Sequence, residues 1–408
     1  MPAPPMRPLS RGLISTTAIL AAGLSGVYLK TGTLRPSSLM PLIRAYSTQP
    51  TLPFTYRLAA AASSKRTPPR TPKAGIDYWT YTSTHVGSTP PYVRSTKPNS
   101  GEDAFFMATV GGSQHHVAFG LADGVGGWQD QGVDPSEFSH GLCGIMAGSA
   151  YLHEGVQEGK IPRPQDLLQT AYDAVIANPR IQAGGSTASL GVVDGNGELE
   201  VANLGDSGYL ILSPGKVAAC SEPQTHAFNT PYQLSKIPAR MRVQQSIFGS
   251  SATFSETPAQ ADVTHHKIAH GDIVIFATDG VLDNLSASDI LATVTKVMED
   301  AGYWSKATDG KSGTETKLNA TLVQEIPVVV TKESRDSYLP GIVARAIMTE
   351  AKSAGLDSKR NGPFAKEVKK AYPHENWQGG KEDDIAVVVA IAVKNGPLGE
   401  ERPIKAKL

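Results

Sequence analysis

Residues 117–124 read Val-Ala-Phe-Gly-Leu-Ala-Asp-Gly, a short apolar run that ends in an aspartate and a glycine. Such a run predicts a buried strand, because its residues are apolar and a turn dipeptide follows them. The same arrangement recurs where residues 201–205 lead into Asp206, and where residues 273–278 lead into Asp279. The chain is therefore expected to contain several buried strands that end at an acidic residue.

The other periodic segments indicate the fold class. Further strands are predicted at 189–193, 199–203, 209–212 and 385–393, and Asn196-Gly197 predicts an antiparallel hairpin between the first two. Helices are predicted after the N-cap pair Asp134-Pro135, after Ser286 with Asp289 as a capping box, and over residues 338–354. Strands cluster early and late with helices between them, which indicates an α+β protein with antiparallel sheets covered by helices.

Two acidic pairs, Glu102-Asp103 and Asp383-Asp384, directly precede apolar runs. If these strand ends share one rim of the fold, their carboxylates raise one another's pKa and destabilise the fold unless a cation neutralises them. Carboxylates without a matching set of His or Cys favour Mg²⁺ or Mn²⁺ over Zn²⁺. Two such ions can bridge a water and present hydroxide to phosphorus, so the sequence predicts a metal site for phosphate chemistry.

The charge distribution separates the N-terminal segment from the rest of the 408 residues. Residues 1–76 contain ten basic residues and no acid, whereas residues 77–408 carry a net charge of −10. An acidic domain without a basic stripe argues against nucleic acid as a partner. Two cysteines exclude a disulfide scaffold.

An acid-free stretch that contains Arg, Ser and Ala is typical of a mitochondrial transit peptide. Its uncharged run 12–29 is at the short end for a membrane anchor, and membrane contact is expected only if that run is retained. The predicted organisation is a transit peptide at 1–46, a disordered linker at 47–76, a catalytic domain at 77–397 with a polar insertion or mobile loop at about 303–335, and a tail at 398–408.

Seven motifs occur in order along the domain: Gly-Glu-Asp-Ala at 101–104, Ala-Asp-Gly-Val-Gly-Gly-Trp at 122–128, Gly-Ser-Thr-Ala at 185–188, Asn-Leu-Gly-Asp-Ser-Gly at 203–208, Phe-Asn-Thr-Pro at 228–231, Ala-Thr-Asp-Gly at 277–280 with Asp283-Asn284, and Lys-Glu-Asp-Asp-Ile at 381–385. With them the sequence resembles the metal-dependent protein phosphatases of type 2C, in particular their mitochondrial branch. The resemblance implies a four-layer αββα sandwich of two antiparallel sheets flanked by helices, with the metals at one end between the sheets.

The resemblance also implies a role for each acidic residue. Asp123 would bridge two Mg²⁺ or Mn²⁺ ions and, with Asp279, form the catalytic centre. The remaining ligands would be Glu102, the Gly124 carbonyl and Asp383, with Asp206 holding the looser third ion seen in some family members. Asp103 and Asp384 would orient these ligands.

The sequence departs from the family pattern at two positions. Val125 stands where many relatives have a histidine that is proposed to protonate the leaving oxygen. Many relatives also carry a phosphate-binding arginine shortly before the Glu-Asp pair, whereas the nearest bases here are Arg94 and Lys97. Loss of a general acid typically costs about 10²–10⁴-fold in rate, so slow turnover is expected unless another group substitutes.

The resemblance predicts a protein serine/threonine phosphatase in the mitochondrial matrix that uses a metal-bridged hydroxide. Its substrates would be phosphoproteins, and kinship alone suggests enzymes of ubiquinone synthesis among them. The alternative is a pseudophosphatase, in which the same fold serves as a binding or regulatory module. A metal-dependent nuclease is a poorer third reading, because an acidic domain repels polyanions.

Overall fold

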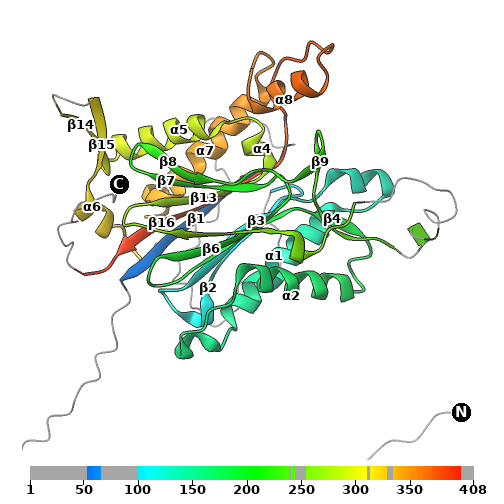
Figure 1. Cartoon of the computed structure of the whole chain (residues 1–408), viewed down its shortest axis with the longest axis horizontal. Helices are drawn as coiled ribbons and strands as arrows, with labels where there is room; N and C mark the ends of the chain where they lie inside the picture. The colour runs from blue at the N-terminus through cyan, green and yellow to red at the C-terminus, as the bar shows by residue number, and fades with distance from the viewer. Residues whose placement is uncertain are drawn as a thin grey trace, which may run out of the picture. The chain divides into compact units, whose positions relative to one another are not determined.

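Two antiparallel five-stranded sheets form the framework of the computed structural model (Figure 1). The structure describes residues 53–65, 100–238, 240–241, 243, 254–309, 313–328 and 334–396, all within the unit Pro50–Leu408. The first sheet has the order β1 (Phe54–Ser63), β16 (Ile385–Lys394), β13 (Ile273–Ala277), β7 (Gly208–Ser213) and β8 (Lys216–Cys220). The second has the order β12 (Asp262–Lys267), β6 (Glu198–Leu204), β5 (Ala188–Val193), β3 (Val117–Ala122) and β2 (Ala104–Thr109).

Helices cover the outer face of each sheet, as Figure 1 shows. On the second sheet these are α1 (Pro135–Tyr151) and α2 (Pro164–Ala177), and on the first sheet α4 (Asp279–Leu282), α5 (Ala287–Asp300) and α7 (Leu339–Leu356). The smaller elements are α6 (Ala320–Gln324), α8 (Pro363–Ala371) and three two-stranded ribbons: β4 (Gly184–Ser186) with β11 (Leu234–Lys236), β9 (Thr225–Ala227) with β10 (Thr230–Pro231), and β14 (Trp304–Asp309) with β15 (Gly313–Leu318).

Three apolar clusters hold these layers together. One lies between the sheets, where Phe119 of β3 meets Phe276 of β13 edge to face at 5.3 Å. A second joins α1 and α2 to the second sheet through side chains such as Phe138, and a third joins α5 and α7 to the first sheet through side chains such as Ile347. The expected α+β, αββα architecture is therefore confirmed.

The helix caps and the hairpin turn that the sequence predicts are present in the structure. The Asp134 side chain accepts a hydrogen bond from the Ser136 amide at 3.0 Å and caps α1. Ser286 and Asp289 form the capping box of α5. The hairpin at Gly197, with a positive φ of 85°, pairs β5 with β6. Caps and turns depend on residues close in the chain, which is why sequence alone located them.

The predicted linker is wrong for residues 54–63, which form β1. This strand pairs with β16 over its whole length, from Phe54↔Lys394 to Ser63↔Ile385, and nine of its ten residues are buried. This strand was not predicted because its alanines and Arg57 are also typical of a polar linker. Arg57 is buried because its Nε donates to the Ile326 carbonyl at 2.9 Å. The folded domain therefore begins before residue 77.

The predicted loop at 303–335 is also wrong in its described part, which contains β14, β15 and α6. Trp304, Val323 and Ile326 are at most 2% exposed and belong to the apolar cluster between the first sheet and its helices. Three apolar anchors spaced along a polar segment produce no regular period, so the pattern gave no sign of burial.

The remaining predicted segments, namely 1–46 with its run 12–29, residues 66–76 and 398–408, lie outside the described residues. Within the part of the chain that the structure describes, no helix is both long and apolar enough to cross a membrane.

Candidate metal centre

The sheet register brings the acidic strand ends to one end of the sandwich. Ala104 pairs with Ala122, so Asp103 and Asp123, the next residues outward, lie at the same edge of the second sheet. In the first sheet Ala277 pairs with both Gly208 and Val387, which places the end of β13 beside the starts of β7 and β16. Asp206 lies in the connection from β6 to β7, which joins the two sheets at this end.

Asp123 is the centre of the acidic cluster. Its carboxyl group lies close enough to that of Asp279 to influence the pKa of Asp279, although the two residues follow strands of different sheets. Burial raises the pKa of Asp123 well above its ordinary value, and four neighbouring carboxylates raise it further: Asp279, Asp103, Asp383 and Asp206. These carboxyl groups, which are distant in the sequence, therefore lie near enough to one another to interact electrostatically.

Lys381 provides the positive charge inside the cluster. Its ammonium contacts Asp279 and lies 2.7 Å from Asp283 Oδ2 and 3.3 Å from Asp383 Oδ2. Asn284 holds the Lys381 backbone, because its Oδ1 accepts from the Lys381 amide at 2.9 Å and its Nδ2 donates to the Lys381 carbonyl at 2.8 Å. The cluster is therefore partly neutralised by the protein itself.

The pKa values show where charge remains uncompensated. Burial raises the pKa of Asp279, but the Lys381 ammonium and its hydrogen bond more than offset burial and lower it. Burial, with the charges of Asp279 and Asp283, raises the pKa of Asp206 to about 8. Burial and the charge of Asp384 raise the pKa of Asp103 well above its ordinary value. The surroundings of Asp103, Asp123 and Asp206 are therefore the least compensated, and they favour the protonated forms of these three groups when no cation is bound.

The donor set fits a hard divalent cation. All the clustered donors are carboxylate oxygens, and the buried Oδ1 atoms of Asp103 and Asp206 have no hydrogen-bond partner. Among the described residues, however, no three acidic, His or Cys side chains are already spaced as a complete ligand group. The carboxylates are gathered at one end of the sandwich without forming such a group.

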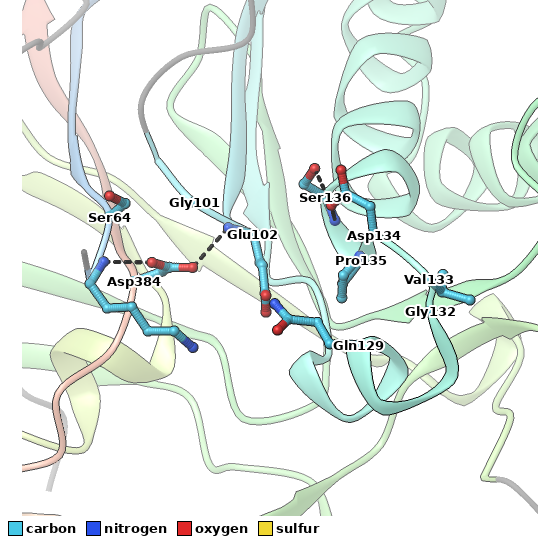
Figure 2. Close-up of a pocket in the computed structure, with 11 residues that line it drawn as sticks. Ser64, Gly101, Glu102, Gln129, Gly132, Val133, Asp134, Pro135, Ser136 and Asp384 are labelled. Carbon is cyan, nitrogen blue, oxygen red and sulfur yellow. Dashed lines mark hydrogen bonds between the residues drawn. The ribbon is translucent and has the colours of Figure 1, made fainter. Parts of the chain in front are cut away.

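Asp384 positions Glu102 at the margin of the cluster (Figure 2). Its Oδ2 accepts from the Glu102 amide at 2.8 Å, and its Oδ1 accepts from the Lys65 amide at 2.6 Å. Gly101 makes this approach possible, since a Cβ there would lie 2.2 Å from the Asp384 carboxylate. Asp384 therefore ties the end of β1 to the residue predicted to reach a metal ion.

A cavity of about 710 Å³ opens beside Glu102. Figure 2 shows Glu102 and Gln129 directed toward one another, with Asp134 and Ser136 at the start of α1. Lys65 also lines this cavity. Such a volume can receive a phosphorylated side chain.

The other predicted residues support the cluster through short-range contacts. Asp103 is buried and its Oδ2 accepts from Thr278 Oγ1 at 2.9 Å. The Gly124 amide donates to the Glu102 carbonyl at 3.2 Å, and a Cβ on Gly124 would lie 2.8 Å from that oxygen. Val125 donates its amide to the Gly185 carbonyl at 3.0 Å, and its side chain has no proton to transfer. Arg94 and Lys97 lie outside the described residues.

Sequence reasoning missed the roles of Lys381, Asp283, Asn284 and Thr278. All four lie within motifs that were recognised or directly beside one, but they carried no assigned function. A signal was available at Lys381, which stands two residues before Asp383. A lysine beside acidic residues in the sequence usually forms a solvent-exposed ion pair. Only the structure shows that the Lys381 side chain is 17% exposed.

The metal-free protein is expected to lose stability as the pH rises from about 5 to about 8. Folded Asp206 has a pKa near 8 and folded Asp283 near 6, against an ordinary value of 3.8. In that window the folded state holds protons that the unfolded state has released, so the free energy of unfolding falls with rising pH. The lowered pKa of Asp279 makes the free energy of unfolding rise with pH, but only at more acidic pH.

Thermal unfolding in the presence of a chelator, measured across that range, checks this expectation. Each kcal/mol lost should lower Tm by about 2–4 °C in a large domain. The decrease should shrink in Mn²⁺, because a bound cation compensates the ionised carboxylates. A Tm that rises steadily toward pH 8 without metal would contradict the crowding of these acids.

Known proteins are similar to this chain in sequence and in fold. No family model matches the chain. Over 296 residues it is 33% identical to the Saccharomyces cerevisiae protein named protein phosphatase 2C homolog 7, mitochondrial, covering 72% of this chain and 75% of the relative. It is 33% identical to the human protein phosphatase PTC7 homolog over 299 residues, covering 72% of this chain and 80% of the relative.

A solved structure agrees with the fold. The X-ray structure of the photosystem II phosphatase PBCP matches with a TM-score of 0.50 and 24% identity, covering 71% of this chain and 91% of that one. At this identity the likeness concerns the fold, which is the sandwich described above. Because the sequence relatives exceed 30% identity over most of their length, the chain belongs to the protein phosphatase 2C family of metal-dependent serine/threonine phosphatases.

Proposed function

We propose that this protein hydrolyses phosphoserine and phosphothreonine of mitochondrial proteins with two Mg²⁺ or Mn²⁺ ions held by Asp123, Asp279, Asp383, Glu102 and the Gly124 carbonyl. The observation that carries the proposal is the buried carboxylate cluster, in which Asp123 and Asp279 meet across the two sheets. When bound, such ions lower the pKa of water and polarise the phosphoryl oxygens.

The protein's own residues organise this site around the reacting group. Asp384 holds Glu102 through its amide, and Thr278 holds Asp103 beneath the cluster. Lys381 keeps Asp279 ionised, since its charge lowers the pKa of that carboxyl. An ionised carboxylate at neutral pH is the form that can bind a metal ion.

Lys65 supports a further part of the proposal, the anchoring of the substrate phosphate. It lines the cavity beside Glu102, and its positive charge limits the rise that burial causes in the pKa of Glu102 and of Asp383. Among the described residues its ammonium has no ion pair or hydrogen bond, although its backbone amide is bound by Asp384. A free cation beside the carboxylates is suited to a phosphate and would replace the arginine that many relatives carry.

Replacing Lys65 by Ala is expected to raise KM for p-nitrophenyl phosphate about tenfold or more with a smaller effect on kcat. A charge-assisted hydrogen bond contributes about 1.5–3 kcal/mol, and 1.4 kcal/mol corresponds to a tenfold change. Steady-state kinetics at saturating Mn²⁺ measure the effect, with Lys65→Arg as the charge-conserving control. Loss of metal cannot explain the rise, because removing a cation favours metal binding. An unchanged KM would remove Lys65 from the phosphate site.

A phosphoserine peptide incubated with the protein in Mn²⁺ tests the function directly, with release of inorganic phosphate as the expected result. Val125 motivates the second candidate, a pseudophosphatase, because its side chain cannot protonate the leaving oxygen. Tight Mn²⁺ binding by calorimetry without any phosphate release would favour that binding module. If hydrolysis is observed, the bound ions would supply this acidity in place of a side chain, since they lower the pKa of water.

The proposed location is the mitochondrial matrix, on the basis of the acid-free basic segment and of the yeast relative that is named mitochondrial. Import of residues 1–46 fused to a reporter into isolated mitochondria tests it. Enzymes of ubiquinone synthesis are candidate substrates by kinship alone, and a phosphoproteome with and without the protein would identify the true ones.

A further inference from the structure

One side of the acidic cluster already contains a cation, and the other side does not. The Lys381 ammonium is paired with Asp279, Asp283 and Asp383. Among the described residues, neither Asp103 nor Asp123 has an ion pair. Among the described residues, the cluster is therefore asymmetric in charge, because the ammonium lies on the side of Asp279, Asp283 and Asp383 and not beside Asp103 or Asp123.

The position of this ammonium is fixed from several directions. Asn284 binds both the amide and the carbonyl of Lys381, and the Phe364 ring lies 5.5 Å from Nζ. The side chain is only 17% exposed. A long lysine side chain held in this way does not simply swing into solvent, since three carboxylates would be left without it.

We propose that Lys381 is a built-in cation that occupies the Asp206–Asp279–Asp283 side of the cluster, so that this protein binds two divalent ions and excludes a third. The inference rests on the proposed metal-dependent function. It concerns the number of ions and the residue that sets it.

The geometry allows Lys381 and two ions to share the cluster. Nζ contacts the Oδ2 atoms of Asp279 and Asp383, and each carboxylate has a second oxygen with lone pairs of its own. A divalent ion on the Asp123 side can therefore use those remaining oxygens while Lys381 stays in place. An ion bound between Asp279 and Asp283 would instead have to fill the space of the ammonium, because both sit within about 3 Å of the same oxygens.

Charge favours the same arrangement. Burial raises the pKa of Asp206 and Asp283, and the nearby ammonium limits this rise because it compensates part of the negative charge there. A third dication would bring two further positive charges next to it, and the two would repel at short range. The side without a protein cation, around Asp103 and Asp123, has no such repulsion.

Metal stoichiometry tests the inference without reference to activity. Equilibrium dialysis against Mn²⁺ up to millimolar free concentration, followed by elemental analysis, should give two ions per chain for the unaltered protein. Lys381→Met should bind a third ion, whereas Lys381→Arg should still bind two. Lys236→Met is a matched control, since Lys236 donates to the Val175 and Asn178 carbonyls and lies outside the cluster. It should also bind two.

A second variant identifies where the third ion binds. In the Lys381→Met background, Asp283→Asn should abolish the third ion, because Asp283 would be one of its ligands. The metal-free Lys381→Met protein should unfold at lower temperature than the unaltered protein and should gain more from Mn²⁺, as removing one partner of a buried pair leaves charges uncompensated.

The number of Mn²⁺ ions bound by the unaltered protein can overturn the inference by itself, even if Lys381→Met does not fold. Three Mn²⁺ ions per chain at saturation would show that Lys381 does not exclude the third. A Lys381→Met protein that folds and still binds two ions would overturn it as well. If the unaltered protein binds no Mn²⁺ at all, the proposed metal-dependent function fails, which is a different result from binding three.

Discussion

Replacing Asp123 by Asn should lower kcat for p-nitrophenyl phosphate in Mn²⁺ by roughly a thousandfold or more. Asp123 lies at the centre of the cluster, and its carboxylate meets Asp279 across the two sheets. A metal site contributes several kcal/mol of transition-state stabilisation, and each 1.36 kcal/mol is tenfold in rate. The amide keeps the shape of the side chain but removes the charge that would bridge two ions.

The same variant should be at least as stable as the unaltered protein when both are metal-free. The raised pKa of Asp123 means that its ionised form destabilises the folded state, so a neutral amide relieves repulsion. Thermal unfolding in a chelator measures this, and Mn²⁺ should stabilise the variant less than the parent. Lys236→Met serves as a remote control for both measurements. A variant that turns over at the parental rate would refute the central role of Asp123.

Removing residues 1–76 should prevent the domain from folding. Such a chain starts at the boundary that composition suggests, but it lacks β1, which covers the edge of the first sheet beside β16. Tyr56 and Leu58 are each 2% exposed and fill the space between the sheets. Full burial of one large apolar side chain contributes about 1.5–3 kcal/mol, so the loss of a whole strand approaches the 5–15 kcal/mol that typically stabilises a domain.

Removing only residues 1–49 is the matched control, and that chain should fold, because the compact unit begins at Pro50. Circular dichroism and thermal unfolding of the two truncated chains compare them directly. Within the longer chain, Leu58→Ala should cost about 2–5 kcal/mol, as expected for a buried leucine. If the chain lacking residues 1–76 unfolds at the same temperature as the longer one, β1 is dispensable and this prediction is wrong.

The elements with strong local signals were predictable from the sequence. The apolar run 117–122 is β3 residue for residue, and the Asn196-Gly197 turn joins β5 to β6. Asp134 caps α1, and Ser286 caps α5. Each of these signals acts over a few residues, through a cap, a turn or a buried run.

The gathering of the acidic residues was predictable for a related reason. Asp123 and Asp279 each follow a buried strand, Asp383 precedes one, and antiparallel strands bring such ends to the same edge. The expected crowding of charge is present as raised pKa values at Asp103, Asp123 and Asp206. The rotation of each carboxylate and the order of the strands could not be read from the pattern.

The sequence by itself determined the strand ends, the helix caps and the acidic residues of the centre, because each depends on chemistry within a few positions. Only the tertiary structure decided that the alanine-rich residues 54–63 form a core strand and that Lys381 neutralises Asp279 and Asp283. The partner of β1 lies more than 300 residues further along the chain, and Lys381 lies about 100 residues from its aspartates. Whether an alanine lies in a core strand, or a lysine in a buried ion pair, depends on the residues packed around it. Those residues are distant in the sequence and become neighbours only when the chain folds.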